Sequence, residues 1–207
     1  DHALHMAAHT LDCMARGGLY DQLGGGFHRY STDAHWLVPH FEKMLYDNAL
    51  LAQAYLEAFQ ATGNDFFREV VEQTLAYVAR EMTSPQGAFF STQDADSEGE
   101  EGKFFVWTLR EIQDLLGPDD AAVFAAVYGV TAQGNWEGRN ILHRGRSYAE
   151  DARLLQMPET DLRRRLAACQ DQLLAARSRR VWPAKDDKIL TSWNALMIAA
   201  FAAAAQV

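Results

Sequence analysis

The chain has 207 residues, of which 48% are hydrophobic and 23% charged, so it can bury the core of one large domain or two small ones. Its net charge is −9, which makes it a poor candidate for binding nucleic acid, and no apolar segment reaches the roughly 20 residues of a membrane span. Cys13 and Cys169 form no CxxC motif, and this cysteine usage fits a reducing cytoplasm.

Helical periodicity dominates the chain, and it predicts helices of two kinds. Segments 2–16, 65–83 and 159–178 carry one apolar stripe, whereas segments 39–61 and 192–207 are apolar on nearly every side. A helix that is apolar all round must be enclosed, and an amphipathic helix lies outside it. This alternation predicts an all-α fold over a single domain, 1–207: a partial α/α toroid with a small β-hairpin in a long loop.

A short internal repeat supports this order. The triplet Asn-Ala-Leu occurs at 48–50 and again at 194–196, each time near the start of an all-apolar helix. Thr-Leu pairs at 10–11 and 74–75 precede glycine-containing loops with Phe27 and Phe89. Each unit therefore reads as outer helix, glycine-aromatic loop and inner helix.

Long loops separate the predicted helices, and loops of this length in a compact domain are usually functional. Residues 17–38 are rich in glycine and aromatic side chains. Residues 84–107 are expected to form a hairpin from strands 88–92 and 103–107 around an acidic turn. Thr108 is expected to cap a short helix that runs to Leu116, and 129–158 is expected to be irregular, with room for short helices.

Ionisable and aromatic residues gather where the inner helices are predicted to begin. Pro39 suits a first helical position, so His40, Glu42 and Lys43 are expected in the first turn, with Asp47 on the same side. Free N–H groups and the positive dipole end there favour anions and oxygen-rich ligands. The other residues expected around this opening are Trp36, Asp94, Asp96, Lys103, Trp107, Arg110, Asp186, Lys188, Trp193 and Asn194.

Carboxylates, a histidine, lysines and tryptophans around one pocket are what a sugar site needs. Two carboxylates can catalyse glycoside hydrolysis, and a histidine or glutamate pair can move a proton next to a carbonyl, as in epimerisation. We expect His40 to transfer protons with Glu42 or Asp94 as its partner, and Asp96 is a further catalytic candidate. The predicted sugar platforms are Trp36, Trp107 and Trp193. The groups predicted to hold substrate oxygens are Arg110 and Lys188.

Each of these residues also has an ordinary structural explanation. Glu42 and Lys43 could form a plain charged first turn, His40 could bond locally, and Asp47 could pair with Lys43 at i, i+4. The acidic turn that begins at Asp94 lacks the final glutamate of a calcium loop and is more simply a solvated turn. Histidines at positions 2, 5 and 9 share one helix face, and a solvated outer surface is simpler there than a metal site.

Three long stretches resemble a known family. They are GGLYDQLGGGFHRYSTDAHWLVPHFEKMLYDNALL, GAFFSTQDADSEGEEGKFFVWT and DDKILTSWNALMI. They resemble the YyaL-type thioredoxin-domain-containing proteins, a family with a spermatogenesis-associated member in animals, and the similarity runs over the whole chain. The resemblance implies a longer parent chain, with a thioredoxin-like domain followed by an α/α toroid of the six-hairpin glycosidase type, related to N-acylglucosamine 2-epimerase.

The sequence thus favours a piece of a carbohydrate-active enzyme, either a glycoside hydrolase or a sugar epimerase or isomerase. The alternative is a non-catalytic module that binds a partner or supports a redox domain. About three outer–inner hairpins are visible, and half a ring should expose an apolar flank and self-associate. The expected ligand is a small sugar, with no cofactor, no metal, no nucleic acid and no membrane partner.

Overall fold

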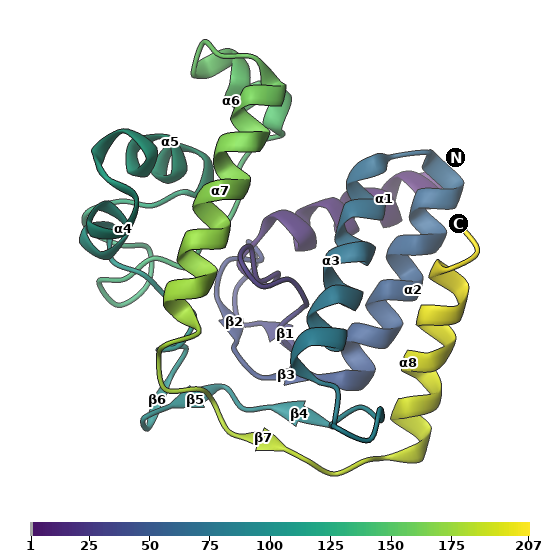
Figure 1. Ribbon diagram of the computed structural model, residues 1–207. Helices are drawn as coiled ribbons and strands as arrows, with labels where there is room; N and C mark the ends of the chain where they lie inside the picture. The colour runs from purple at the N-terminus through teal and green to yellow at the C-terminus, as the bar shows by residue number, and fades with distance from the viewer. Residues whose placement is uncertain (1) are drawn as a thin grey trace.

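A computed structural model describes residues 2–207, and over this range the protein is α-rich with small antiparallel strand pairs, as predicted. The helices are α1 (His2–Arg16), α2 (Leu45–Thr62), α3 (Asp65–Glu81), α4 (Leu109–Leu116), α5 (Pro118–Tyr128), α6 (Tyr148–Leu154), α7 (Glu159–Arg177) and α8 (Thr191–Ala204). The strands are β1 (Tyr30–Ser31), β2 (Pro39–His40), β3 (Lys43–Met44), β4 (Thr92–Gln93), β5 (Asp96–Ser97), β6 (Glu100–Glu101) and β7 (Lys185–Asp186). Figure 1 shows two groups of helices joined by extended chain along one side of the molecule.

Helix α2 is the centre of the first group, where it packs against α3 and α8 and also contacts α1. Its Tyr55 is fully buried, and the Tyr55 hydroxyl donates to the backbone carbonyl of Leu11 in α1 at 2.6 Å. Helix α8 is equally apolar, but only one of its sides is covered by the rest of the protein. Met197 and Ala200 on that side are buried, whereas Ile198 is 60% exposed. Within residues 2–207, no helix is long and apolar enough to cross a membrane.

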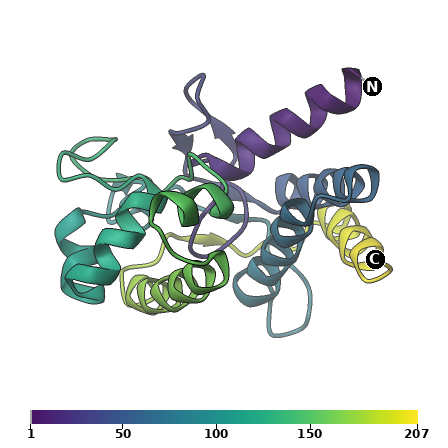
Figure 2. The ribbon, with the colours of Figure 1, turned by 90° about the horizontal axis from the view of Figure 1, so that it is seen from above.

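The second group contains α4 to α7, with α7 packed against the other three helices. The predicted start of α4 is confirmed: the Thr108 hydroxyl accepts from the backbone N–H of Glu111, and the Glu111 carboxylate accepts from the N–H of Thr108. This capping box satisfies two N–H groups that the helix leaves free. Helix α5 was not predicted, because Pro118 was interpreted only as the end of α4. Proline also suits the first position of a helix, and α5 begins at Pro118. In Figure 2, which shows the molecule from above, this group lies beside the first and α1 projects outward.

Strands β3, β4 and β7 form a small antiparallel sheet that joins the two groups. Met44 pairs with Thr92, and Thr92 pairs with Asp186. Both outer strands therefore run the same way, and α2 and α8, which follow them, begin at the same end of the first group (Figure 1). The predicted hairpin was wrong in its pairing, because Trp107 bonds instead with Asn140, and the local hairpin is β5–β6 at the acidic turn.

Helix α2 begins later than the sequence predicted. Pro39 and His40 pair with β1, and Lys43 pairs with β4, so the helix starts only at Leu45. The expectation that His40, Glu42 and Lys43 occupy a first helical turn was therefore wrong. Extended chain sends alternate side chains to opposite faces, which is why Lys43 becomes buried while Glu42 does not.

The internal repeat has a direct structural counterpart. The side-chain oxygen of Asn48 accepts from the backbone N–H of Phe27 at 2.7 Å, and its amide donates to the Phe27 carbonyl at 3.0 Å. Asn194 makes the same pair of bonds with Phe89, at 2.8 and 2.9 Å. Each amide also bonds the carbonyl four residues earlier. The repeated asparagine therefore ties a glycine-aromatic loop to its helix, and Asn194, predicted to bind substrate, has a structural role.

Candidate functional site

A pocket of about 460 Å³ lies over one face of the β3–β4–β7 sheet, next to the start of α8. Met44, Thr92 and Asp186 share that face because they are register partners, and side chains two positions away on each strand point the same way. Five of the predicted residues line this pocket, which we call the sheet pocket: Glu42, Asp94, Asp186, Lys188 and Trp193.

Glu42 connects the sheet pocket to His40. Its carboxylate lies 3.0 Å from the Arg29 guanidinium and 3.6 Å from Nε2 of His40. Nδ1 of His40 lies 2.7 Å from the Glu101 carboxylate, and the imidazole stacks on Tyr30 at 5.1 Å. The imidazole is therefore held between two carboxylates, with an aromatic ring fixing its plane.

Asp47 lies in the first turn of α2, and its carboxylate interacts electrostatically with Arg29 and Glu42. One of its carboxylate oxygens is buried and has no hydrogen-bond partner in the described range, 2–207. Burial raises the pKa of Asp47 to about 6, a rise that the Arg29 charge opposes and the Glu42 charge assists. Shifted carboxyl pKa values are typical of functional sites, but Asp47 does not line the sheet pocket.

The opposite side of the sheet pocket carries an ion pair and an indole. The Lys188 ammonium pairs with the Asp186 carboxylate, and 65% of the Lys188 side chain is exposed. The ring of Trp193 lies 4.8 Å from Tyr46 of α2, so the starts of α2 and α8 meet here. Asp94 is exposed, and its carboxylate accepts from the backbone N–H of Asp96 at 3.3 Å. The pocket therefore offers hydrogen-bond acceptors, a cation and an aromatic ring.

Lys43 faces away from the sheet pocket. Its ammonium is buried, donates to the Asp21 carboxylate and the Gly25 carbonyl, both at 2.9 Å, and lies 4.1 Å from the centre of the Tyr77 ring. Burial lowers the pKa of Lys43, although the Asp21 charge opposes that shift. The prediction that Lys43 binds substrate was wrong, because the other face of β3 places it in the core.

Asp21 is the centre of a buried charge cluster that sequence reasoning missed. Besides Lys43, it binds the Arg177 guanidinium through two parallel bonds of 2.8 Å. Burial alone would raise the pKa of Asp21, but the charges of Arg177 and Lys43 outweigh it and hold that pKa well below its usual range. Asp21 and Arg177 are 156 positions apart, so no local motif could have indicated the pair.

Two of the three predicted sugar platforms lie elsewhere. Trp107 is buried, with the Arg180 guanidinium 3.9 Å from its ring centre, so it cannot face a sugar. Trp36 is half-buried with a φ of 61°, and its carbonyl accepts from the N–H of Leu19. It does not line the sheet pocket, and of the predicted platforms Trp193 alone does.

Three further predicted residues also lie outside the sheet pocket. Arg110 is fully at the surface, with 89% of its side chain exposed. Lys103 pairs with Glu100 at 2.9 Å, and Asp96 is exposed on β5. Among residues 2–207, no group of three histidine, cysteine or acidic side chains could hold a metal ion.

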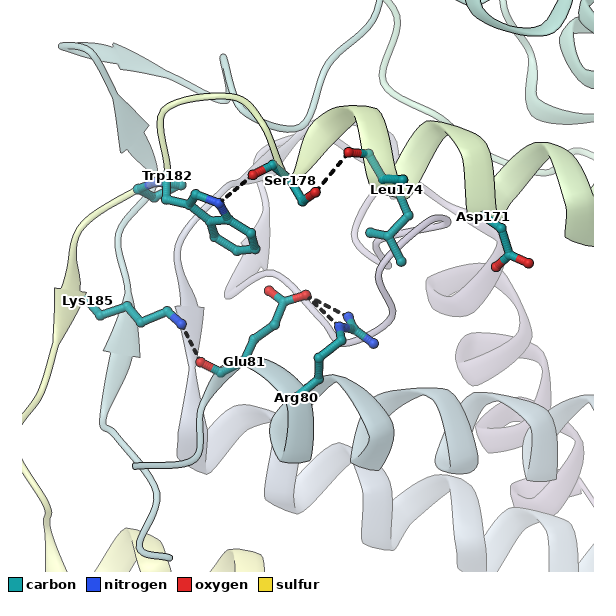
Figure 3. A pocket seen from close by; sticks show the side chains of 9 residues that line it. Arg80, Glu81, Asp171, Leu174, Ser178, Trp182 and Lys185 are labelled. Carbon is teal, nitrogen blue, oxygen red and sulfur yellow. Dashed lines mark hydrogen bonds and ion pairs between the residues drawn. The ribbon is translucent and has the colours of Figure 1, made fainter. Parts of the chain in front are cut away.

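A larger cavity, of about 620 Å³, lies between α3 and α7 (Figure 3). Leu174 and Trp182 give it apolar walls. Three of the charged groups drawn there already have partners: Arg80 pairs with Glu81 at 2.6 Å, and Lys185 donates to the Glu81 carbonyl. None of the predicted site residues lines this cavity, so the sheet pocket is the candidate functional site.

No protein-family model matches the chain. Three curated proteins named spermatogenesis-associated protein 20 do. The protein from Homo sapiens is 40% identical over 97% of this chain, that from Mus musculus 38% over 97%, and that from Rattus norvegicus 37% over 99%. The chain spans 28–29% of the length of these relatives. It is therefore a homologue of one segment of the proteins named spermatogenesis-associated protein 20, which fit the family that its sequence motifs resemble.

Proposed function

We propose that the sheet pocket binds a sugar and that the chain is part of a carbohydrate-active enzyme, either a glycoside hydrolase or a sugar epimerase. One observation carries this proposal: Glu42, Asp94, Asp186, Lys188 and Trp193 come from separate stretches of the chain and line one pocket. Carboxylates and an ammonium can pair with hydroxyl groups, and an indole offers an apolar face to the C–H side of a sugar ring.

The proposed chemistry is proton transfer at Glu42. The neighbouring Arg29 guanidinium stabilises a negative charge on Glu42, so Glu42 is the proposed proton acceptor, and Asp94 is the second carboxylate that faces the pocket. His40, 3.6 Å from Glu42, is positioned to carry the proton away.

We also propose that the first helix group belongs to an α/α toroid. The shared direction of α2 and α8 and their extensive packing support this, because inner helices of such a ring run the same way. The exposed side of α8, with Ile198 at its centre, would then be covered by further helices of a longer protein, or by a second copy of the isolated chain. A monodisperse monomer in light scattering would contradict the latter.

Two parts of this proposal rest mainly on the sequence. A thioredoxin-like domain elsewhere in a longer protein follows from the family resemblance, and the lengths of the relatives leave room for it. A cytoplasmic location is supported by Cys13 and Cys169, both of which are free thiols.

Sugar binding can be tested directly on this chain. A panel of monosaccharides is screened by saturation-transfer NMR, with Glu42→Gln and Asp94→Asn as site variants and Arg110→Gln as the matched surface control. We expect the wild type and the control to bind the same sugar and the site variants to lose it. Melting temperatures of Asp94→Asn and Arg110→Gln should stay close to that of the wild type, since surface substitutions change stability by about 0.5 kcal/mol or less, and a melting curve verifies that Glu42→Gln is folded. A panel without binding, or full binding by Glu42→Gln, would refute the proposal.

A non-catalytic binding module is the second candidate. It is favoured by the positions of Trp36 and Trp107, which leave a single indole at the sheet pocket. The same panel separates the candidates when products are also analysed by NMR. Binding of a sugar without any change in its spectrum over long incubation would support the module, whereas slow conversion that Glu42→Gln abolishes would support the enzyme.

A further inference from the structure

A second pocket, of about 370 Å³, lies on the other side of His40 from the sheet pocket. The β5–β6 hairpin and the loop around residue 136 form it, and we call it the hairpin pocket. Glu101, Lys103, Trp136 and Arg139 line it. With Glu100 and Glu137 it contains the same kinds of group as the sheet pocket: carboxylates, cations and an indole.

His40 joins the two pockets. Its Nδ1 lies 2.7 Å from Glu101, which lines the hairpin pocket, and its Nε2 lies 3.6 Å from Glu42, which lines the sheet pocket. The side chains of His40, Glu42 and Glu101 are 27%, 22% and 44% exposed. His40 itself lines neither pocket, but the three partly exposed side chains form a line that leads from a residue of one pocket to a residue of the other.

The connection between the pockets is also firmly held. Glu101 accepts a second bond, from the backbone N–H of Phe41 at 3.2 Å. Phe41 itself is buried, and the Trp136 ring packs against it at 5.3 Å. The carboxylate that orients His40 and the indole of the hairpin pocket are therefore fixed to the same residue, so the spacing of the two pockets is set by the core.

We propose that the two pockets are subsites for one extended ligand, a linear oligosaccharide of at least two rings whose linkage crosses His40. This inference rests on the proposed sugar-binding function and names its ligand class. Each pocket alone lies at the small end of the usual range for ligand sites, roughly 300–1,000 Å³. A repeating ligand is matched by a repeated set of groups: Trp193 with Lys188 in one pocket, Trp136 with Arg139 in the other.

Arg139 provides the variant that tests the second subsite. Its structural contacts run through its backbone, which bonds with Asn135 and Trp136, and Arg139→Ala keeps that backbone. Lys103→Gln is a second variant in the same pocket, where the Lys103 side chain pairs with Glu100. Arg110→Ala, at the exposed surface of α4, is the control.

The experiment compares affinities for a monosaccharide, its disaccharide and its trisaccharide by isothermal titration calorimetry, using the sugar found in the NMR panel. We expect the disaccharide to bind at least about tenfold more tightly than the monosaccharide, which corresponds to about 1.4 kcal/mol. Arg139→Ala and Lys103→Gln should bring this ratio close to 1, while Arg110→Ala keeps it. Melting curves of every variant verify that it is folded.

The outcomes separate the two proposals. A wild-type chain that binds the monosaccharide and the disaccharide equally well overturns the extended ligand and leaves sugar binding in the sheet pocket intact. Retention of the ratio by both hairpin-pocket variants overturns it as well. A chain that binds none of the sugars overturns the extended ligand together with the proposed function.

Discussion

Replacing Asp21 with asparagine should greatly lower the free energy of unfolding of this protein without changing its folded structure. Asn is nearly isosteric, and its side-chain oxygen can still accept the backbone N–H groups of Leu23 and Gly24, which bond to Asp21 at 3.1 Å. What is lost is the negative charge between Lys43 and Arg177. Both cations would then stay buried without a counter-ion at hydrogen-bond distance.

The size of the effect follows from burial. The side chains of Asp21, Lys43 and Arg177 are 4%, 1% and 3% exposed, so water screens them little. Breaking a buried ion pair by removing one partner costs about 3–5 kcal/mol, a large share of the total stability of roughly 5–15 kcal/mol that proteins have. For a chain of this size, about 2–4 °C of melting temperature per kcal/mol gives a loss of roughly 6–20 °C.

Urea denaturation followed by circular dichroism at pH 7 measures this loss, with Asp12→Asn as the matched control. Asp12 pairs with Arg16 at 2.8 Å along α1, and 32% of its side chain is exposed, so its loss should cost about 0.5 kcal/mol. Because the pKa of Asp21 is depressed, its contribution is complete above the unfolded value of about 3.9 and disappears only in stronger acid. A cost for Asp21→Asn below about 1 kcal/mol at pH 7 would refute this reasoning.

Three further predictions concern pH and the repeat. Burial lowers the pKa of His28 to about 3, so between pH 3 and about 6.5 the unfolded chain binds one proton more than the folded chain. The free energy of unfolding should therefore rise with pH in this range by about 1.4 kcal/mol per pH unit. Urea titrations from pH 5 to 6.5 should show a smaller slope for His28→Gln than for the wild type, and an unchanged slope would contradict this. Burial raises the pKa of Asp47 to about 6, so the folded state binds the extra proton and stability falls as pH rises from about 4 to 6. Asp47→Asn should therefore be more stable than the wild type by roughly 1 kcal/mol at pH 7.5, after allowance for its partial exposure, and similar to it at pH 4; thermal melts that show no gain at pH 7.5 would argue against a buried carboxylate. Asn48→Ala and Asn194→Ala should each lose about 2–3 kcal/mol in chemical denaturation, because each asparagine makes three bonds to backbone groups; a loss under about 1 kcal/mol for Asn194 would reopen a ligand-binding role.

The helices and the repeat could be predicted because their signals are local. The apolar periodicity located α3 and α7 to within two residues, and the capping sequence at Thr108 identified the start of α4. The repeated Asn-Ala-Leu triplet indicated equivalent helices, although not the bonds that Asn48 and Asn194 make. Helical periodicity also misled at 39–44, since pairing with β1 and β4 overrides the preference of Pro39 for a helix start.

The candidate site was predictable only in part, because burial depends on strand pairing. Glu42 and Lys43 are neighbours in the sequence and look alike in a helical turn, yet one lines the sheet pocket and the other lies in the core. Trp107 and Trp193 are both near helix starts, but only one is left uncovered. Asp21 and Arg177 carry no local signal, since their meeting depends on how the two helix groups pack.

The pairing within the β3–β4–β7 sheet also places neighbouring residues in different roles, one in ligand binding and the next in core packing. Met44 and Thr92 line the pocket, whereas their strand neighbours Lys43 and Gln93 are buried on the other face of the sheet, so β3 and β4 each contribute one position to the pocket and the next to the interior. Substitutions at the former can diversify what is bound while the latter stay as they are. Insertion of one amino acid into β4, however, would exchange the pocket and interior positions of that strand and so impair both ligand binding and folding.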